Sequence, residues 1–408
     1  MSDAIRASVI VVSRGRPELL CRALTGIGQL WYPTFEIVVV ADRAGRDAVE
    51  ALGWSNRIKL ASCDEPNISA ARNIGIGLAA GEVLAFIDDD AVPEPTWLTH
   101  LVAPFADPAV AQTGGFVRAR NGITLQWPVR AVDALGETRV LPTEGDVPFS
   151  PDVAASGAVK TEGTNMALRR DVITSVGGFD EAFRFYLDET DVNFRLKHMK
   201  TVITPLAQVH HGFAGSASRR ANRGVADLTE VGASTLVFLR KHAMPDQLEA
   251  ATNRLFSTQK KRLIGQMVDG ILSPDEIAPL MGTLQSGVEK GRLRTFGSHV
   301  PFTDSPPEYL PFENGMTGQS TVLAGRPWNA KRLSRGAVRS VEKRDVTTVL
   351  RLSPTALSHR VSFNPSGYWE QRGGLFGRSE RAQPWFQWAT FSARLHKEQA
   401  RLSKLRFK

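Results

Sequence analysis

The segment GEVLAFIDDD, residues 81–90, decides the fold of this chain. Its apolar run has the length of a buried strand and stops abruptly at three consecutive aspartates. Similar β-branched runs occur earlier, at residues 7–13 and 35–40, and each is followed by a polar turn. Apolar residues at helical spacing lie between the strands, at 17–24 and 69–80. We therefore predict an α/β fold with a parallel sheet covered by helices on both faces.

Length and composition exclude several classes of protein. The 408 residues are enough for two or three domains, and 42% hydrophobic with 23% charged residues excludes disordered and fibrous chains. The two cysteines, Cys21 and Cys63, exclude a disulfide scaffold and lack the spacing of a zinc site. No apolar stretch reaches the ~18 residues of a membrane span, and the first residues lack a signal-peptide pattern. We expect a soluble, cytoplasmic protein.

We predict three segments along the chain. Residues 1–245 form the α/β domain, 246–300 a helical segment, and 301–408 a basic C-terminal region that contains aromatic residues. Residues 302–328 are rich in Pro, Gly and Ser, which predicts a linker or an extended wrap. Residues 346–352 predict one more strand.

The charge is unevenly distributed. From residue 290 onward there are 21 Lys and Arg against 8 Asp and Glu, a net of +13, whereas the remainder has a net of −5. A basic region next to an acidic one indicates an anionic partner, and we expect an anionic membrane surface at the inner face of the membrane. This expectation rests on Trp385, Phe386, Trp388 and Phe391, which precede a basic helix carrying Arg394, Lys397, Arg401, Lys404 and Arg406. The alternative is that the aromatic residues pack in the fold and the cations solvate the surface. Nucleic-acid binding through this basic tail, with its aromatic residues as stacking platforms, is a further alternative, but no nucleic-acid module is visible and we do not expect such a partner.

In open α/β sheets, ligands bind beyond the carboxyl ends of the strands. Here these positions hold Ser13, Asp42 and residues 88–90. The turn after the first strand reads SRGRP, residues 13–17, so the chain has neither a G-x-G-x-x-G turn nor a P-loop at this place. The site therefore belongs to neither of these two nucleotide-binding classes.

The three aspartates 88–90 predict a metal site. Like charges in a confined place repel one another unless a cation neutralises them, and Mg²⁺ or Mn²⁺ with oxygen ligands would do so. Such an ion can bridge the two phosphates of a nucleotide diphosphate. The alternative is a turn that caps the chain before Pro93 and Pro95.

Five motifs follow one another in a characteristic order: residues 8–24, PNISAARNIG at 66–75, FIDDDA at 86–91, GTNMALRR at 163–170 and GGFDE at 177–181. Together they resemble the family-2 glycosyltransferases of the GT-A fold, and the resemblance covers roughly residues 5–245. It implies an inverting transferase that moves a sugar from a nucleotide-diphosphate-sugar donor to a glycan or lipid-linked acceptor in the assembly of a bacterial surface polysaccharide.

The resemblance also assigns residues to the donor. It places Ser13 and Asp42 at the nucleobase and ribose, and Arg72 beside the base or diphosphate, with a surface salt bridge as the alternative role of Arg72. Asp88 and Asp90 take the places of the D-x-D acids, where Asp90 is a metal ligand and Asp88 a ribose or metal partner. Asp89 lies between them on the donor side or only turns the chain.

Further residues follow from the same likeness. Gly163, Thr164 and Asn165 would form the floor beneath the donor sugar, with a tight turn as the alternative. A histidine completes the metal shell in many relatives, and the match falls on His211, with His210 as runner-up.

The stretch YLDETDVNFRL, residues 186–196, resembles the part of the family that holds the catalytic base. The register gives Glu189 as the base, with Asp191 and Asp188 as the other candidates. Asp188 and Asp191 also have the spacing of a capping box, so both have a structural alternative. Residues 214–224, with Gly215 and Arg219, are nominated as a basic lid over the diphosphate.

Two other functions compete with this reading. A glycoside hydrolase would also use paired carboxylates, but it needs no clamp for a metal and a diphosphate. A protein that binds nucleotide-sugars or glycans without turnover would keep the fold, but it would not need Asp88, Asp90 and Glu189 together.

Overall fold

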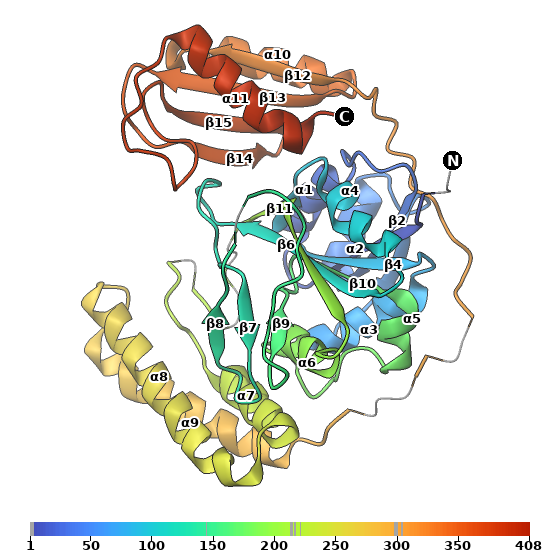
Figure 1. Ribbon diagram of the computed structural model, residues 1–408, viewed down its shortest axis with the longest axis vertical. Helices are drawn as coiled ribbons and strands as arrows, with labels where there is room; N and C mark the ends of the chain where they lie inside the picture. Colours follow the sequence, from blue (N-terminus) through green and yellow to red (C-terminus); the bar gives the residue numbers. More distant parts are fainter. Residues whose placement is uncertain are drawn as a thin grey trace.

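The computed structural model describes residues 4–143, 145–212, 215, 218–220, 222–297, 301–302 and 305–408. An eight-stranded sheet with the order β3-β2-β1-β4-β10-β6-β11-β5 forms the centre of the N-terminal part (Figure 1). Its strands are β1 (Ala7–Ser13), β2 (Phe35–Ala41), β3 (Lys59–Ser62), β4 (Val83–Asp88), β5 (Ala91–Pro93), β6 (Val110–Arg118), β10 (Met166–Arg169) and β11 (Lys200–His211).

Half of this sheet is parallel, as the sequence predicts. Strands β3, β2, β1 and β4 run in parallel, and their registers place Ser13 opposite Ala41 and Val12 opposite Asp88. Alternate residues of β1 enter two cores, because Val9 packs on one face of the sheet and Ile10 on the other. The helices that connect and cover these strands are α1 (Pro17–Ile27), α2 (Arg43–Ala51) and α3 (Ile68–Leu78).

The other half of the sheet is mixed, which corrects the expectation of a wholly parallel sheet. β10 runs antiparallel to both β4 and β6, and β5 runs antiparallel to β11. Parallel pairing requires a long crossover on one face, and neither of these short strands is reached by a helix of that kind. The remaining helices of this part are α4 (Trp97–Val102), η1 (Ala103–Ala106), α5 (Arg170–Ser175), α6 (Asp188–Arg195) and α7 (Thr229–His242).

A small second sheet lies in the excursion between β6 and β10. Its order is β8-β7-β9, and all its pairs are antiparallel. The strands are β7 (Arg130–Val132), β8 (Thr138–Val140) and β9 (Ala158–Lys160). β9 packs against α6, so this excursion reaches the helix that carries the predicted base.

The predicted helical segment contains two long helices, α8 (Leu248–Val268) and α9 (Ile277–Leu293), preceded by the short helices η2 (Pro245–Gln247) and η3 (Pro274–Glu276). α9 packs closely against α7, because glycines face the other helix at the contact. A Cβ at Gly287 would lie 2.1 Å from the carbonyl oxygen of Thr229, so a larger residue would force the helices apart.

A third sheet forms a separate C-terminal unit, joined to the rest by an extended segment that runs along the outside (Figure 1). Its order is β12-β13-β15-β14, with β12, β13 and β15 parallel. The predicted linker is therefore part strand, because β12 lies within it. The elements are β12 (Ser320–Gly325), η4 (Pro327–Asn329), α10 (Ala330–Glu342), β13 (Val346–Ser353), β14 (Arg360–Asn364), β15 (Tyr368–Gly374) and α11 (Phe391–Arg406).

Of the five cations on α11 that the expectation of an anionic partner names, Arg394 and Arg406 pack inside the fold, whereas Lys397 and Lys404 are exposed. Arg394 and Arg406 are each 1% exposed. Arg406 holds the Glu94 carboxylate at 2.6 Å, and Arg394 pairs with Glu398 at 3.0 Å. Buried cations must be paired, so Arg394 and Arg406 serve ion pairs within the protein. None of the described helices is long and apolar enough to cross a membrane.

Candidate active site

The carboxyl ends of β1, β2 and β4 meet at one edge of the sheet, where the sequence places Ser13, Asp42 and the three aspartates. Ser13 Oγ donates to Asp89 Oδ2 at 2.7 Å, and Arg16 contacts the other oxygen of Asp89 at 2.9 Å. Burial raises the pKa of Asp89 to about 7, against the lowering effect of Arg16. Asp89 therefore ties the loop after β1 to the end of β4.

Asp42 also supports the loops at this edge. Its carboxylate accepts hydrogen bonds from the backbone N–H of Gly45 at 3.0 Å and of Gly15 at 2.8 Å. The first bond caps helix α2, and the second holds the turn after β1.

Asp88, Asp90 and His211 converge on one point, and one ligand atom from each lies within 4.8 Å of the other two. His211 Nε2 is 3.1 Å from Asp90 and 3.8 Å from Asp88. Two carboxylates and an imidazole are a ligand set that suits Mn²⁺, so these residues fit the metal that the sequence predicts.

The second ring nitrogen of His211 is held from outside the cluster. Nδ1 lies 3.0 Å from Oε1 of Gln126, an oxygen that accepts the ring proton and leaves Nε2 directed at the two aspartates. Burial lowers the pKa of His211, but the bond to Asp90 and the charge of Asp88 outweigh burial, and the net shift is upward.

His210, the runner-up, faces a different group. Its Nε2 lies 2.8 Å from the Glu94 carboxylate, and its ring packs against Trp369 of the C-terminal unit at 4.8 Å between ring centres. Neighbouring residues of a strand point to opposite sides, which separates the two histidines. Only His211 belongs to the cluster with Asp88 and Asp90.

Arg72 connects the acidic cluster to helix α6. It is 3% exposed, so the alternative of a surface salt bridge is wrong. Its guanidinium lies 3.5 Å from Asp88 and pairs directly with Asp188. A Cβ at Gly163 would lie 2.6 Å from the Arg72 guanidinium, so the glycine leaves the space that this arginine fills.

The predicted floor of the donor site includes Asn165, whose side chain holds neighbouring strands together. The Asn165 side chain accepts from Trp97 Nε1 at 2.7 Å and donates to the carbonyls of Phe116 and Ala207 at 3.0 and 2.9 Å. Asn165 is fully buried and joins neighbouring strands, and its backbone N–H donates to the Glu162 carbonyl at 2.8 Å, which is the tight turn of the structural alternative. Thr164 is also buried, and its hydroxyl has no hydrogen-bond partner within the described part of the chain.

Glu189 is held by a lysine that the sequence analysis did not single out. Lys160 Nζ lies 2.6 Å from Glu189 Oε1 and 2.6 Å from Thr190 Oγ1. Burial would raise the pKa of Glu189, but the nearby Lys160 ammonium outweighs it and lowers the pKa to about 2. Glu189 is therefore ionised at every physiological pH.

The two neighbouring acids have other partners. Asp191 is fully buried and lies 2.8 Å from each of Arg195, Lys241 and His242. Burial raises its pKa, but these partners lower it well below the ordinary range. Asp188 opens α6 without acting as its cap, because Leu187 occupies that position, so no capping box forms.

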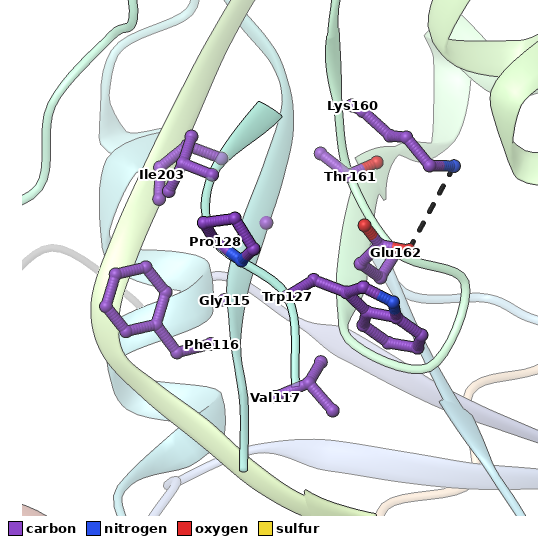
Figure 2. Close-up of a pocket in the computed structure, with 11 residues that line it drawn as sticks. Gly115, Phe116, Val117, Trp127, Pro128, Lys160, Thr161, Glu162 and Ile203 are labelled. Carbon is purple, nitrogen blue, oxygen red and sulfur yellow. Dashed lines mark ion pairs between the residues drawn. The ribbon is translucent and has the colours of Figure 1, made fainter. Parts of the chain in front are cut away.

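A small pocket is lined by residues of β6 and of the excursion around the small sheet, among them Lys160, which pairs with Glu189 (Figure 2). Trp127 lines it, and the Trp127 ring centre is 6.3 Å from that of His211. Lys160 and Glu162 also line it, with their charged groups 4.0 Å apart. The lining of the pocket thus includes Trp127, which lies near His211, and Lys160, which pairs with Glu189.

Sequence reasoning missed Trp127, Lys160, Glu162 and Gln126 because they belong to the excursion around the small sheet. No motif marks them, and β9 is only three residues long. The predicted lid, 214–224, lies partly outside the described residues. Its described portion includes Arg220, which pairs with Glu276 at 2.5 Å.

The sequence model of the family described as "Glycosyl transferase family 2" matches residues 8–173. This range contains the parallel half of the sheet, Asp88 and Asp90. The N-terminal part of the chain is therefore similar to the family-2 glycosyltransferases over residues 8–173. Its mixed sheet and the family match give the α/β unit the GT-A fold that the sequence predicts.

Three curated relatives illustrate the range of this family. O-antigen biosynthesis protein RfbC of Myxococcus xanthus is 31% identical over 53% of this chain and 18% of that protein. Succinoglycan biosynthesis protein ExoM of Rhizobium meliloti is 32% identical over 43% of this chain and 55% of that protein. Validoxylamine A glucosyltransferase of Streptomyces hygroscopicus subsp. limoneus is 27% identical over 71% of this chain and 70% of that protein. The chain thus spans about a fifth of the first relative and about half of the second.

Proposed function

We propose that this family-2 glycosyltransferase moves a sugar from a nucleotide-diphosphate donor to an acceptor hydroxyl, with inversion at the anomeric carbon and with a divalent metal. The convergence of Asp88, Asp90 and His211 at the end of β4 carries the proposal. These ligands would hold Mn²⁺ or Mg²⁺, and a bound ion would neutralise the charge that develops on the leaving diphosphate.

Inversion requires the acceptor hydroxyl to attack one face of the anomeric carbon while the diphosphate leaves from the other. The proton of the hydroxyl passes to the Glu189 carboxylate. A hydroxyl becomes strongly acidic as its oxygen bonds to the sugar, so a carboxylate with a low pKa can still accept the proton. Lys160 keeps that carboxylate charged until the proton arrives.

Arg72 links the donor side of the site to the helix that carries the proposed base. It contacts Asp88 on the donor side and Asp188 next to the base, so it fixes the distance between the end of β4 and the start of α6. Ser13, Asp42 and the described part of the 214–224 segment are proposed to bind the nucleoside and to cover the diphosphate.

The acceptor is proposed to be a glycan or a lipid-linked saccharide. RfbC and ExoM are named for the biosynthesis of O-antigen and succinoglycan, both bacterial polysaccharides. The proposal for this chain is therefore a step in the assembly of a surface polysaccharide, carried out at the cytoplasmic side of the membrane.

The first experiment identifies the donor. Thermal unfolding is measured with UDP-, GDP- and dTDP-sugars, each with and without Mn²⁺, because a ligand that binds the folded state raises the unfolding temperature. We expect one nucleotide class to stabilise the protein only when Mn²⁺ is present. Release of the nucleoside diphosphate in the presence of that donor and Mn²⁺, as the sugar passes to an added glycan acceptor or more slowly to water, then tests turnover. No release with any donor, in a protein that binds the donor, would favour a binding protein over an enzyme.

A further inference from the structure

The C-terminal unit gathers exposed apolar side chains at one edge of its sheet. Strands β12, β13 and β15 are parallel, so the segments that follow them lie at the same edge, at the left of this unit in Figure 1. Each segment presents large apolar residues that are between 56% and 81% exposed. We name this set the aromatic edge; it comprises Trp328, Leu357, Trp385, Phe386 and Trp388.

The aromatic edge is held in place by its own packing. Phe376 stacks on Trp388 with ring centres 5.2 Å apart and on Phe386 at 5.5 Å. The Arg378 guanidinium lies 3.6 Å from the ring centre of Trp385. The rings of Trp385, Phe386 and Trp388 are therefore presented to the outside on a packed base, and a cluster of exposed apolar side chains of this kind marks an interaction site.

Cations on α10 lie next to the Trp328 part of the aromatic edge. Helix α10 begins directly after Trp328 and buries Leu333 and Ala337 against the sheet, while Lys331, Arg332 and Arg335 are exposed. Lys331 and Arg335 line an open hollow with Ala330 and Ser334, where the anionic group of a partner would meet two positive charges.

The same edge holds little negative charge. In residues 326–339, 353–359 and 375–390 the single acidic residue is Glu380. Glu380 is engaged on the inner side, where it pairs with Arg118 at 2.8 Å and with Arg401 at 3.2 Å. Uncompensated cations next to exposed indole rings match the surface of an anionic bilayer, which attracts basic residues and accepts tryptophan at its interface.

We propose that the aromatic edge, together with the first turns of α10, docks this chain on an anionic lipid bilayer. The cations of α11 are not needed, since Arg394 and Arg406 are buried in ion pairs. The edge lies in a unit separate from the catalytic domain, so the inference stands independently of the proposed sugar transfer.

Cosedimentation of the full chain with phosphatidylcholine vesicles, with and without about a third phosphatidylglycerol, tests the proposal. We expect binding only to the anionic vesicles and a steep loss of binding with salt. The pair Lys331→Glu and Arg332→Glu should weaken binding about tenfold or more, because each basic residue near the leaflet contributes appreciably. The pair Trp328→Ser and Trp388→Ser should weaken binding with little change in its salt dependence.

The matched control is the pair Lys260→Glu and Lys261→Glu on α8. It makes the same change in net charge at two adjacent, exposed helix positions. Unchanged vesicle binding in this control, with the loss confined to the α10 pair, supports the proposal. Equal loss in both pairs, no vesicle binding by the unaltered chain, or retention on a glycan or nucleic acid in place of vesicles would overturn it.

Discussion

His210 and His211 are adjacent on β11, yet they belong to two regions with different roles. His211 meets Asp88 and Asp90 at the carboxyl end of the sheet, whereas His210 meets Glu94, which already has a cation in Arg406. Helix α6 repeats the contrast. Glu189 pairs with Lys160, which lines the pocket, whereas Asp191 is enclosed by three basic groups.

The difference shows how one set of elements serves both stability and chemistry. In the supporting region, a protein cation satisfies each buried carboxylate, so substitution there should cost free energy of unfolding. In the site region, carboxylates and an imidazole converge from different elements, so substitution there should cost turnover. Variants of each region test this division.

The largest effect is expected from Glu189→Gln, which keeps the shape of the side chain but cannot accept a proton. The rate of transfer should fall by about 10² to 10⁴, while donor binding and the unfolding temperature stay close to those of the unaltered chain. Steady-state kinetics and a donor-binding titration measure both. An active Glu189→Gln variant beside a folded but inactive Asp191→Asn variant would make Asp191 the base.

The supporting region should respond in stability. Arg406→Met leaves Glu94 buried without its cation, and such a loss typically costs about 3 to 5 kcal/mol. Denaturant unfolding measures the change, with Lys404→Met as the control, because Lys404 pairs with Asp146 at an exposed position. A change in Arg406→Met as small as that in the control would show that the pair does not hold the C-terminal unit in place.

The smallest effect is expected from Lys160→Gln, which should change the pH dependence of the rate. Glu189 must be ionised to accept the proton. Burial alone raises its pKa above the ordinary value of 4.5, and the Lys160 ammonium lowers it to about 2. Without Lys160 the rate should therefore begin to fall at a higher pH as the solution is acidified. Profiles of kcat/KM from about pH 4 to about pH 8 measure this. If the profile of Lys160→Gln coincides with that of Lys200→Gln, a surface control, then Lys160 does not set the pKa of the catalytic base.

The sequence predicted the parts of the fold that have strong local patterns. The runs at β1, β2 and β4 are apolar and almost completely buried, so their composition and length identify them without tertiary information. Strands β5 and β10 were missed because three- and four-residue strands have no periodicity to detect. Their direction depends on pairing with distant segments, which no local pattern encodes.

The same limit applies to the site. Asp88 and Asp90 follow a strong strand, and their position alone indicates a ligand site. Lys160 and Trp127 reach the pocket through the fold of the excursion, so only the structure brings them to Glu189 and His211. The aromatic and basic residues near the C-terminus were visible in the sequence, but their division into a buried helix and an exposed edge depends on the third sheet.

The central claim is that Asp88, Asp90 and His211 hold the metal that sugar transfer requires. Its most direct test is the rate of nucleoside diphosphate release as a function of Mn²⁺ concentration, for the unaltered chain, for Asp90→Asn and for the exposed control Asp47→Asn. We predict a saturable dependence on Mn²⁺ in the unaltered chain and the control, and a rate lower by about 10² or more in Asp90→Asn. Full activity of Asp90→Asn, or release that a chelator leaves unchanged in the unaltered chain, would contradict the claim.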